Sequence, residues 1–303
     1  MKILVTGATG LIGQELIRLW IEKEYKIHYL TTRKNHKHPH PNVTPFYWNP
    51  ESETIDLNCF EGVQVVVNLA GASVSKRWTS SYKKKIQESR VNGALLLVNA
   101  IQKLPTHQIQ QLVSASAIGI YPHDLQCLYT EKETKIADSF LGTVVKQWEN
   151  AVESFAKINI PVTTIRIGLV LSNQGGALPM TTLPIRYGVG SWFGSGKQWP
   201  SWIHIEDMAR IIDFVIANKL EGVYNAVAPH PVTNKEFIKS IAKVLHRPLF
   251  LPPVPQFFMK LVLGEMASVI FESQQVSSQK IQNAGFEFHF SKLHPALLSL
   301  FKK

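Results

Sequence analysis

The chain has 303 residues, of which 45% are hydrophobic and 18% charged, a composition typical of a soluble globular protein with one large domain or a large domain and a small appendage. Its apolar stretches are too short to span a membrane, glycines interrupt any signal-peptide pattern at the N-terminus, and the two cysteines form neither a disulfide framework nor a metal motif. The net charge of +10 is spread along the chain, which favours small anionic ligands over nucleic acid, and we expect a cytoplasmic protein.

A glycine-rich turn opens the chain. Gly7, Gly10 and Gly13 lie between an apolar strand-like run, Lys2–Thr6, and a helical pattern, Leu11–Glu24. Glycines at a strand-to-helix turn let the backbone approach a pyrophosphate closely, and the N-terminus of the following helix offers it free N–H groups. Because the glycines occupy this position in the chain, the turn predicts a dinucleotide site.

The end of the next strand-like run, Lys26–Thr32, indicates which nicotinamide cofactor binds. A site for NAD usually has an Asp or Glu about 20 residues past the glycines, which binds the ribose 2′-hydroxyl. No Asp or Glu occurs between Tyr25 and Pro50, and Thr32 and Arg33 stand at the expected place. Since a guanidinium binds a 2′-phosphate, we predict NADP(H); the alternative is that Arg33 is an ordinary surface residue.

Strand-like runs then alternate with helical patterns. Val91, Leu95, Val98 and Ile101 have helical spacing and predict one buried face of the longer helix. Such alternation is typical of right-handed βαβ units, so we expect an α/β fold with a Rossmann-type, doubly wound parallel sheet. No metal site is expected. The further predicted strands are Val43–Trp48, Val63–Asn68, Gln111–Ala115 and Val162–Gly168, and the helices are Ser80–Leu104 and Ser139–Ile158.

The pattern changes after about residue 170. Residues 173–202 are rich in glycine and tryptophan and predict irregular chain folded over a site. A helix near Asn234–Leu245, a proline-rich break and further helical patterns predict a small, mainly helical C-terminal lobe. We therefore expect a cofactor domain at 1–170, with strand contributions from about 203–228, and a substrate side at 171–202 and 229–303.

Motifs along the whole chain point to one family. The sequence resembles the short-chain dehydrogenase/reductase superfamily, and within it an atypical branch of the extended, epimerase-like group, the YfcH-like epimerase family. The resemblance runs from residue 1 to nearly residue 300 and includes the C-terminal lobe of that branch. The motifs are Thr6–Gly13, Asn68–Gly71, Arg77-Trp78, Ser89–Val91, Ser114–Gly119 with Tyr121, Trp148-Glu149, Arg166–Leu171, Gly175–Leu178, Gly194–Gly196, Trp202–Asp207, Asn225–Pro229 and Arg247-Pro248.

The resemblance implies a cofactor map. The turn around Thr9 would meet the pyrophosphate, and Thr32 with Arg33 the adenosine 2′-phosphate. The residues after the predicted strand at 63–68 would pass beside the adenine ribose, with Arg90 behind them, and Ser114 would lie towards the nicotinamide. The full implied set is Gly7, Thr9, Gly10, Leu11, Ile12, Gly13, Thr32, Arg33, Leu69, Ala70, Gly71, Arg90 and Ser114.

The superfamily's Tyr-x-x-x-Lys pair is missing, as it is in the branch that the chain resembles. Counting back eight and four residues from Glu149 gives Leu141 and Val145, neither of which transfers a proton. The candidate catalytic replacements are Ser116 and Tyr121. Ser116 would position a carbonyl oxygen or cap the strand end, and Tyr121 would face the nicotinamide or be a buried structural tyrosine.

Four residues are candidates for substrate binding: Arg77, Lys83, Arg166 and Trp202. Each also has an ordinary structural alternative. Arg77 would pack a loop, Lys83 belongs to a run of lysines on a helix, Arg166 would pair with a carboxylate, and Trp202 would anchor its loop. For His204 and Asp207 we favour structural roles around the start of a helix.

The sequence therefore predicts an NADP(H)-binding, epimerase-like oxidoreductase whose substrate is a small molecule of unknown identity. The alternative is a catalytically weak NADP(H)-binding sensor or scaffold protein. We expect no nucleic-acid or membrane partner, and a monomer or homodimer.

Overall fold

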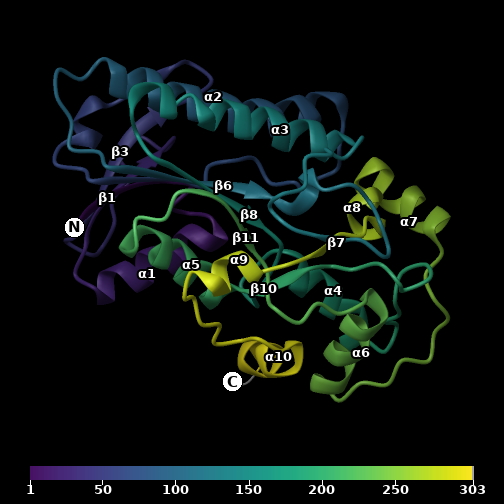
Figure 1. Cartoon of the computed structure of the whole chain (residues 1–303). Helices are drawn as coiled ribbons and strands as arrows, with labels where there is room; N and C mark the ends of the chain where they lie inside the picture. Colours follow the sequence, from purple (N-terminus) through teal and green to yellow (C-terminus); the bar gives the residue numbers. More distant parts are fainter. Residues whose placement is uncertain (302–303) are drawn as a thin grey trace.

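The computed structural model describes residues 1–301 and contains a central sheet of eight strands (Figure 1). The strand order is β11-β8-β6-β5-β1-β2-β3-β4, and every pair is parallel except β3 with β4. The bounds are β1 Lys2–Thr6, β2 Lys26–Thr31, β3 Val43–Asn49, β4 Thr54–Ile55, β5 Val65–Asn68, β6 Gln111–Ala117, β8 Val162–Ile167 and β11 Gly222–Ala226. The predicted doubly wound α/β fold is confirmed, with the strand boundaries within two residues of the predictions.

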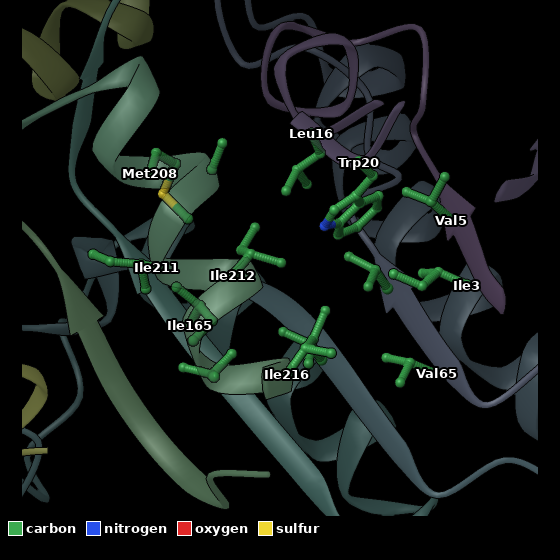
Figure 2. Close-up of a cluster of buried hydrophobic side chains, with 14 of the residues drawn as sticks. Ile3, Val5, Leu16, Trp20, Val65, Ile165, Met208, Ile211, Ile212 and Ile216 are labelled. Atoms are coloured by element: carbon green, nitrogen blue, oxygen red, sulfur yellow. The ribbon is translucent and has the colours of Figure 1, made fainter. Parts of the chain in front are cut away.

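Helices cover both faces of this sheet, α1 (Leu11–Glu22) and α5 (Ile205–Ala217) one face, α2 (Ser80–Gln102) and α3 (Phe140–Glu153) the other (Figure 1). Figure 2 shows the core beneath the first pair, where Trp20 of α1 joins Ile212 of α5 and Ile3 of β1. Trp20 is fully buried, and its indole N–H donates to Asp213 Oδ1 at 3.0 Å. Strands covered on both faces explain the continuous apolar runs in the sequence.

The buried face of α2 differs from the prediction at one position. Leu95 is 39% exposed, whereas Ala94, Leu97, Val98 and Ile101 are buried. The buried stripe has spacings of three, one and three, and Leu95 lies one residue, or about 100°, away from Ala94 around the helix. Small residues provide the contact here, a role that a search for large apolar side chains misses.

The chain from 169 to 204 is more regular than predicted. β9 (Leu169–Leu171) pairs in parallel with β10 (Trp202–His204), and between them α4 spans Ala177–Arg186, so the prediction of irregular chain was wrong there. Pro179 falls in the first turn of α4, where its missing N–H costs nothing, and Pro184 lies inside the helix. Prolines and glycines therefore concealed a helix whose buried side chains, Leu178 and Ile185, join a third core.

The C-terminal part is mainly helical, as predicted. α6 (Asn234–Val244) and α10 (Leu293–Phe301) pack together in the third core, while α7 (Gln256–Leu263) and α8 (Ser268–Phe271) stand at one end of the molecule (Figure 1). After α8 the chain returns to the main sheet's side through β12 (Gln275–Val276), which pairs with β7 (Leu128–Tyr129), and α9 (Gln279–Asn283). Short 3-10 helices are η1 Leu57–Phe60, η2 Ile118–Ile120, η3 Ala156–Ile158 and η4 Gly264–Ala267. Within residues 1–301, no helix combines the length and apolar character that crossing a bilayer requires.

Candidate functional site

The glycine-rich turn joins β1 to α1 and permits no side chain at two of its glycines. Gly7 has a φ of +70°, and a Cβ there would lie 2.8 Å from the Leu69 carbonyl carbon and oxygen. A Cβ on Gly13 would lie 2.4 Å from the Gly7 oxygen. These two glycines therefore bring the turn, the start of α1 and the segment after β5 into direct backbone contact.

Gly10 differs from the other two because a Cβ there would meet only its own turn, 3.1 Å from Gly7 O. It caps α1 without a side-chain hydrogen bond, and the first turn of the helix contains no acidic residue. Thr9 and Gly10 are exposed. The first N–H groups of α1 thus lack side-chain acceptors, and together with the helix dipole they suit the phosphates of a dinucleotide.

The segment after β2 carries the predicted determinant of cofactor choice. Thr32 and Arg33 are exposed, and the Arg33 N–H donates to Thr31 Oγ1 at 3.1 Å. Among the residues that the structure describes, no carboxylate forms an ion pair with the Arg33 guanidinium. β2 is the immediate neighbour of β1 in the sheet, so this guanidinium and the glycine turn lie at the carboxyl ends of adjacent strands.

A neutral polar network crosses the ends of three strands. Thr6 Oγ1 donates to Asn68 Oδ1 at 2.8 Å and accepts the N–H groups of Leu69 and Ala70 at 3.0 Å, and Asn68 Nδ2 donates to Ser114 Oγ at 3.2 Å. Ser114 is 0% exposed. Its hydroxyl therefore braces β6 against β5, while Leu69 and Ala70 are half-buried beside the glycine turn.

Arg90, on α2, packs behind the segment after β5. A Cβ on Gly71 would lie 2.9 Å from its Cζ, and its Nη1 donates to Ile86 O at 2.8 Å and Ala72 O at 3.2 Å. The guanidinium lies 5.2 Å from the ring centre of Trp148. Burial lowers the pKa of Arg90 to about 10 because no carboxylate compensates for its desolvation. Gly71 is thus required for Arg90 to reach this place.

A second, charged network lies at the ends of β6 and β8. Ser116 Oγ donates to Glu149 Oε1 at 2.5 Å, and Arg166 holds both oxygens of Glu149 at 2.9 Å. Arg166 Nη1 also donates to the Tyr121 hydroxyl at 3.1 Å, and this hydroxyl donates to Asn225 Oδ1 at 2.7 Å. Burial lowers the pKa of Arg166, but the hydrogen bonds and charge of Glu149 outweigh it and raise the pKa above its ordinary value.

This network decides between the alternatives for two predicted residues. Arg166 pairs with a carboxylate, as one of its two interpretations held. Tyr121 is 1% exposed and stacked on Tyr129 at 5.3 Å, with both hydrogen bonds of its hydroxyl made inside the protein. Burial raises the pKa of Tyr121 despite the nearby Arg166, so the structural role is favoured for this residue. Ser116 remains at the end of β6 with its proton directed at Glu149.

The positions of the missing catalytic pair are apolar in space as well as in sequence. Val145 is 3% exposed and belongs to a cluster with Ile120 and Tyr121. Leu141 packs against η2, where a Cβ on Gly119 would lie 3.5 Å from Leu141 Cβ. Neither side chain offers an exchangeable proton beside the exit of β6.

A pocket of about 490 Å³ opens next to Leu141. Trp78 and Phe140 meet edge to face in its wall with ring centres 5.1 Å apart. Its walls come from the segment before α2, the start of α3 and the α7–α8 region. The lining residues are Trp78, Ser139, Phe140, Leu141, Gln256, Lys260, Gly264, Glu265, Ser268 and Glu272. No spacing or motif in the sequence marks Glu272.

Two of the three predicted basic substrate residues, Arg77 and Lys83, lie around this pocket without lining it. Lys83 Nζ donates to Glu265 Oε2 at 2.6 Å and lies 4.7 Å from the ring centre of Phe140. Arg77 is exposed and directly precedes the buried Trp78. Lys83 therefore ties α2 to η4 at the rim of the pocket.

The remaining predicted residues hold the chain after β9 in place. Trp202 is 0% exposed within the third core, which favours the anchoring role over contact with a substrate. His204 Nδ1 accepts the Glu206 N–H at 3.2 Å and caps α5, and Asp207 Oδ2 accepts the Phe290 N–H at 2.8 Å. The structural roles favoured for His204 and Asp207 are confirmed.

A larger hollow, of about 720 Å³, lies elsewhere, between α1, α5 and the segment around Phe286. Several of its charged side chains pair with one another, including Lys23 with Asp213 and Arg18 with Glu22, and the exposed Glu287 also lines it. It contains none of the predicted site residues. Within residues 1–301, no group of three or more His, Cys, Asp or Glu side chains is placed to hold a metal ion.

Comparison with known proteins identifies the family. The NAD dependent epimerase/dehydratase family model matches residues 3–226, and a domain of unknown function matches residues 254–300. The epimerase family protein SSP1921 of Staphylococcus saprophyticus is 38% identical over 301 residues, 98% of each chain.

Solved structures extend the likeness to three dimensions. The human epimerase family protein SDR39U1, crystallised with NADPH, has a TM-score of 0.84 and 29% identity, with 99% of each chain covered. The nucleoside-diphosphate sugar epimerase of Corynebacterium glutamicum has a TM-score of 0.77 and 28% identity, covering 98% of this chain and 57% of that one. The resemblance seen in the sequence is thus confirmed, and the chain belongs to the NAD dependent epimerase/dehydratase family.

Proposed function

We propose that the chain binds NADP(H) and acts as an epimerase-like oxidoreductase on a small-molecule substrate. The observation that carries the proposal is the pairing of a helix N-terminus without side-chain acceptors with an exposed guanidinium, Arg33, one strand away. The first suits a pyrophosphate and the second a 2′-phosphate. A relative crystallised with NADPH supports the same cofactor. We place this activity in the cytoplasm, with no nucleic-acid or membrane partner.

The residues present fit this cofactor. Gly10 and Thr9 would lie against the pyrophosphate, Thr32 and Arg33 against the 2′-phosphate, and the backbone at Leu69–Gly71 against the adenosine ribose. When bound, NADPH supplies a hydride to a substrate carbon. The Ser116 hydroxyl donates its hydrogen bond to Glu149 and is 2% exposed, so its proton is not directed at a substrate carbonyl.

An NADP(H)-binding sensor or scaffold is the second candidate. It is favoured by the apolar Leu141 and Val145 and by the burial of the Tyr121 hydroxyl, which leave the end of β6 without the usual proton donor. Loss of such a group lowers turnover by about 10²–10⁴-fold unless another replaces it. NADPH consumption with a panel of aldehydes and ketones distinguishes the candidates, because a sensor binds the cofactor and consumes none.

Isothermal titration calorimetry with NADPH and NADH tests the cofactor assignment. Arg33→Asp should weaken NADPH binding by at least about tenfold and shift the preference towards NADH, since a charge-assisted pair with the 2′-phosphate is lost. Lys34→Asp is the matched control, because Lys34 lies 5.6 Å from the Tyr47 ring centre and is not assigned to the cofactor. An Arg33→Asp variant with the wild-type preference contradicts the assignment, and a wild type that binds neither dinucleotide contradicts the function.

A further inference from the structure

Glu272 is the one carboxyl of the 490 Å³ pocket that lies against the chain leaving β6. The amide Nε2 of Gln274 donates to Glu272 Oε2 at 3.3 Å and to Tyr121 O at 3.4 Å. The neighbouring Ser273 N–H donates to His123 Nδ1 at 2.9 Å, and its carbonyl accepts the Asp124 N–H at 3.0 Å. The segment carrying Glu272 is thus fixed to residues 121–124, directly after η2.

The same pocket reaches Leu141, which packs on η2. Parallel α/β sheets bind their ligands outside the carboxyl ends of the strands, and η2 follows the carboxyl end of β6. The pocket therefore lies on the side of the sheet where a substrate would meet the cofactor. Leu141 offers no proton there, whereas Glu272 does.

The aromatic wall indicates the kind of molecule that fits. Trp78 and Phe140 present ring faces and edges, and the indole N–H of Trp78 is already donated to Val74 O at 3.0 Å. Leu141 adds apolar surface beside them. A planar apolar body would bury against this wall with a polar oxygen directed at the opposite, charged side.

We propose that this pocket binds a small aromatic or apolar aldehyde or ketone and that the Glu272 carboxyl transfers the proton to its oxygen. In the reduction the Glu272 O–H bond breaks, its electron pair stays on the carboxylate, and the proton forms the O–H bond of the alcohol. The inference rests on the proposed function, by which NADPH supplies the hydride to the carbonyl carbon. Water then returns a proton to the carboxylate.

The electrostatic surroundings of Glu272 agree with an acid role. Burial raises its pKa, while the hydrogen bond from Gln274 and the charge of His123 oppose the shift. Lys260 on α7 and Glu265 on η4 are the other charged groups of the pocket. A carboxyl that keeps its proton closer to neutral pH is suited to general acid catalysis.

The first test needs no turnover. An aryl diazoacetamide, which esterifies protonated carboxyls, is added to the wild-type protein at about pH 6, where an ordinary glutamate is ionised, and labelled peptides are identified by mass spectrometry. We expect Glu272 to be labelled at least about tenfold more than the exposed Glu287 of the other hollow, and NADPH with acetophenone to protect it. Equal labelling of the two residues, or no protection, overturns the proposal.

The second test compares variants. Glu272→Gln should reduce benzaldehyde with NADPH about 10²-fold more slowly or worse and bind NADPH with the wild-type Kd, and Glu287→Gln should match the wild type. An unchanged rate in Glu272→Gln, or a wild type that binds NADPH and leaves benzaldehyde unreduced, overturns the role of Glu272. A wild type that binds no NADPH overturns the proposed function instead.

Discussion

The proposed cofactor side and the proposed substrate pocket of this protein differ in what lines them. The cofactor side consists largely of backbone, in a turn where Gly7 and Gly13 have no room for a side chain and Gly10 leaves the helix N-terminus open. The proposed substrate pocket consists of side chains from three distant segments, represented by Trp78, Leu141 and Glu272. A site made of backbone tolerates little change in sequence, whereas a site made of side chains can be altered without loss of the fold.

The largest effect is expected at Gly13. Gly13→Ala places a Cβ 2.4 Å from the Gly7 carbonyl oxygen, so the turn and α1 must separate. We expect the free energy of unfolding to fall by about 3 kcal/mol, at the upper end for an overpacked site. Chemical denaturation with the wild type in parallel measures it.

Gly10→Ala is the matched control for this turn. Its Cβ would be 3.1 Å from Gly7 O and otherwise unobstructed, so unfolding should change by less than about 1 kcal/mol. Its NADPH affinity should nevertheless fall, because the new methyl group lies where the pyrophosphate would approach. Equal destabilisation by the two substitutions would show that Gly13 is not needed for packing any more than Gly10 is, contrary to this expectation.

A smaller effect is expected at the Arg166–Glu149 pair, which joins β8 to α3. The side chains are 9% and 13% exposed, so Arg166→Met leaves a carboxylate with little solvent and only Ser116 as donor. Breaking a fully buried pair costs about 3–5 kcal/mol, and the remaining exposure lowers our expectation to about 2 kcal/mol. Thermal and urea unfolding provide the measurement.

The double variant Arg166→Met, Glu149→Leu tests the cause. If the loss comes from an unpaired charge and not from lost packing, removing Glu149 as well should recover part of the stability. A double variant less stable than Arg166→Met would contradict this. It would show that Glu149 stabilises the fold by packing and hydrogen bonding more than its unpaired charge destabilises it.

The sequence predicted the strands, turn and helix of the proposed cofactor side because local patterns determine them. Lys2–Thr6, the glycine turn and the start of α1 follow one another in the chain, and the absence of an acidic residue after β2 is visible without coordinates. By contrast, the partner of Arg166 was left open between a carboxylate and a substrate. Glu149 lies 17 residues away from it, and nothing local in the sequence shows that a side chain from α3 reaches β8.

Glu272 shows most clearly what could not be predicted from the sequence. Leu141 and Trp78, which line the same pocket, are more than a hundred residues away in sequence. Its proposed role also depends on burial, and the sequence around a single glutamate in a polar stretch does not show that it is buried. The helix α4 was missed for a related reason, since prolines normally indicate a break. Pro179 is tolerated because it falls in the first turn, whereas Pro184 lies inside the helix. The substrate side therefore required the structure.

The smallest predicted effect concerns the contact between α5 and α10, at His204. Its Nδ1 caps α5 on the sheet, its Nε2 lies 3.1 Å from Ser299 Oγ on α10, and it is 5% exposed. Burial lowers its pKa below the ordinary 6.5, although Asp207 and Glu206 oppose the shift. Below pH 6.5 His204 is therefore protonated to a greater extent in the unfolded chain than in the folded protein. Its contribution to the free energy of unfolding is complete above pH 6.5 and decreases as the pH falls below this value.

His204→Asn keeps a side chain that caps a helix and removes the titration. It should lower the free energy of unfolding at every pH, because the ring of His204 lies 3.8 Å from that of Phe290, centre to centre, and this contact is lost. It should also make the loss of unfolding free energy at acid pH less steep. Some decline should remain, because burial also lowers the pKa of His28. Urea unfolding between about pH 5 and 8 measures both quantities, and the parallel curves expected above about pH 7 are the internal control. Equal losses of unfolding free energy below pH 6.5 in the two proteins would place the titration elsewhere, and the α5–α10 contact would then be held by packing and the helix cap alone.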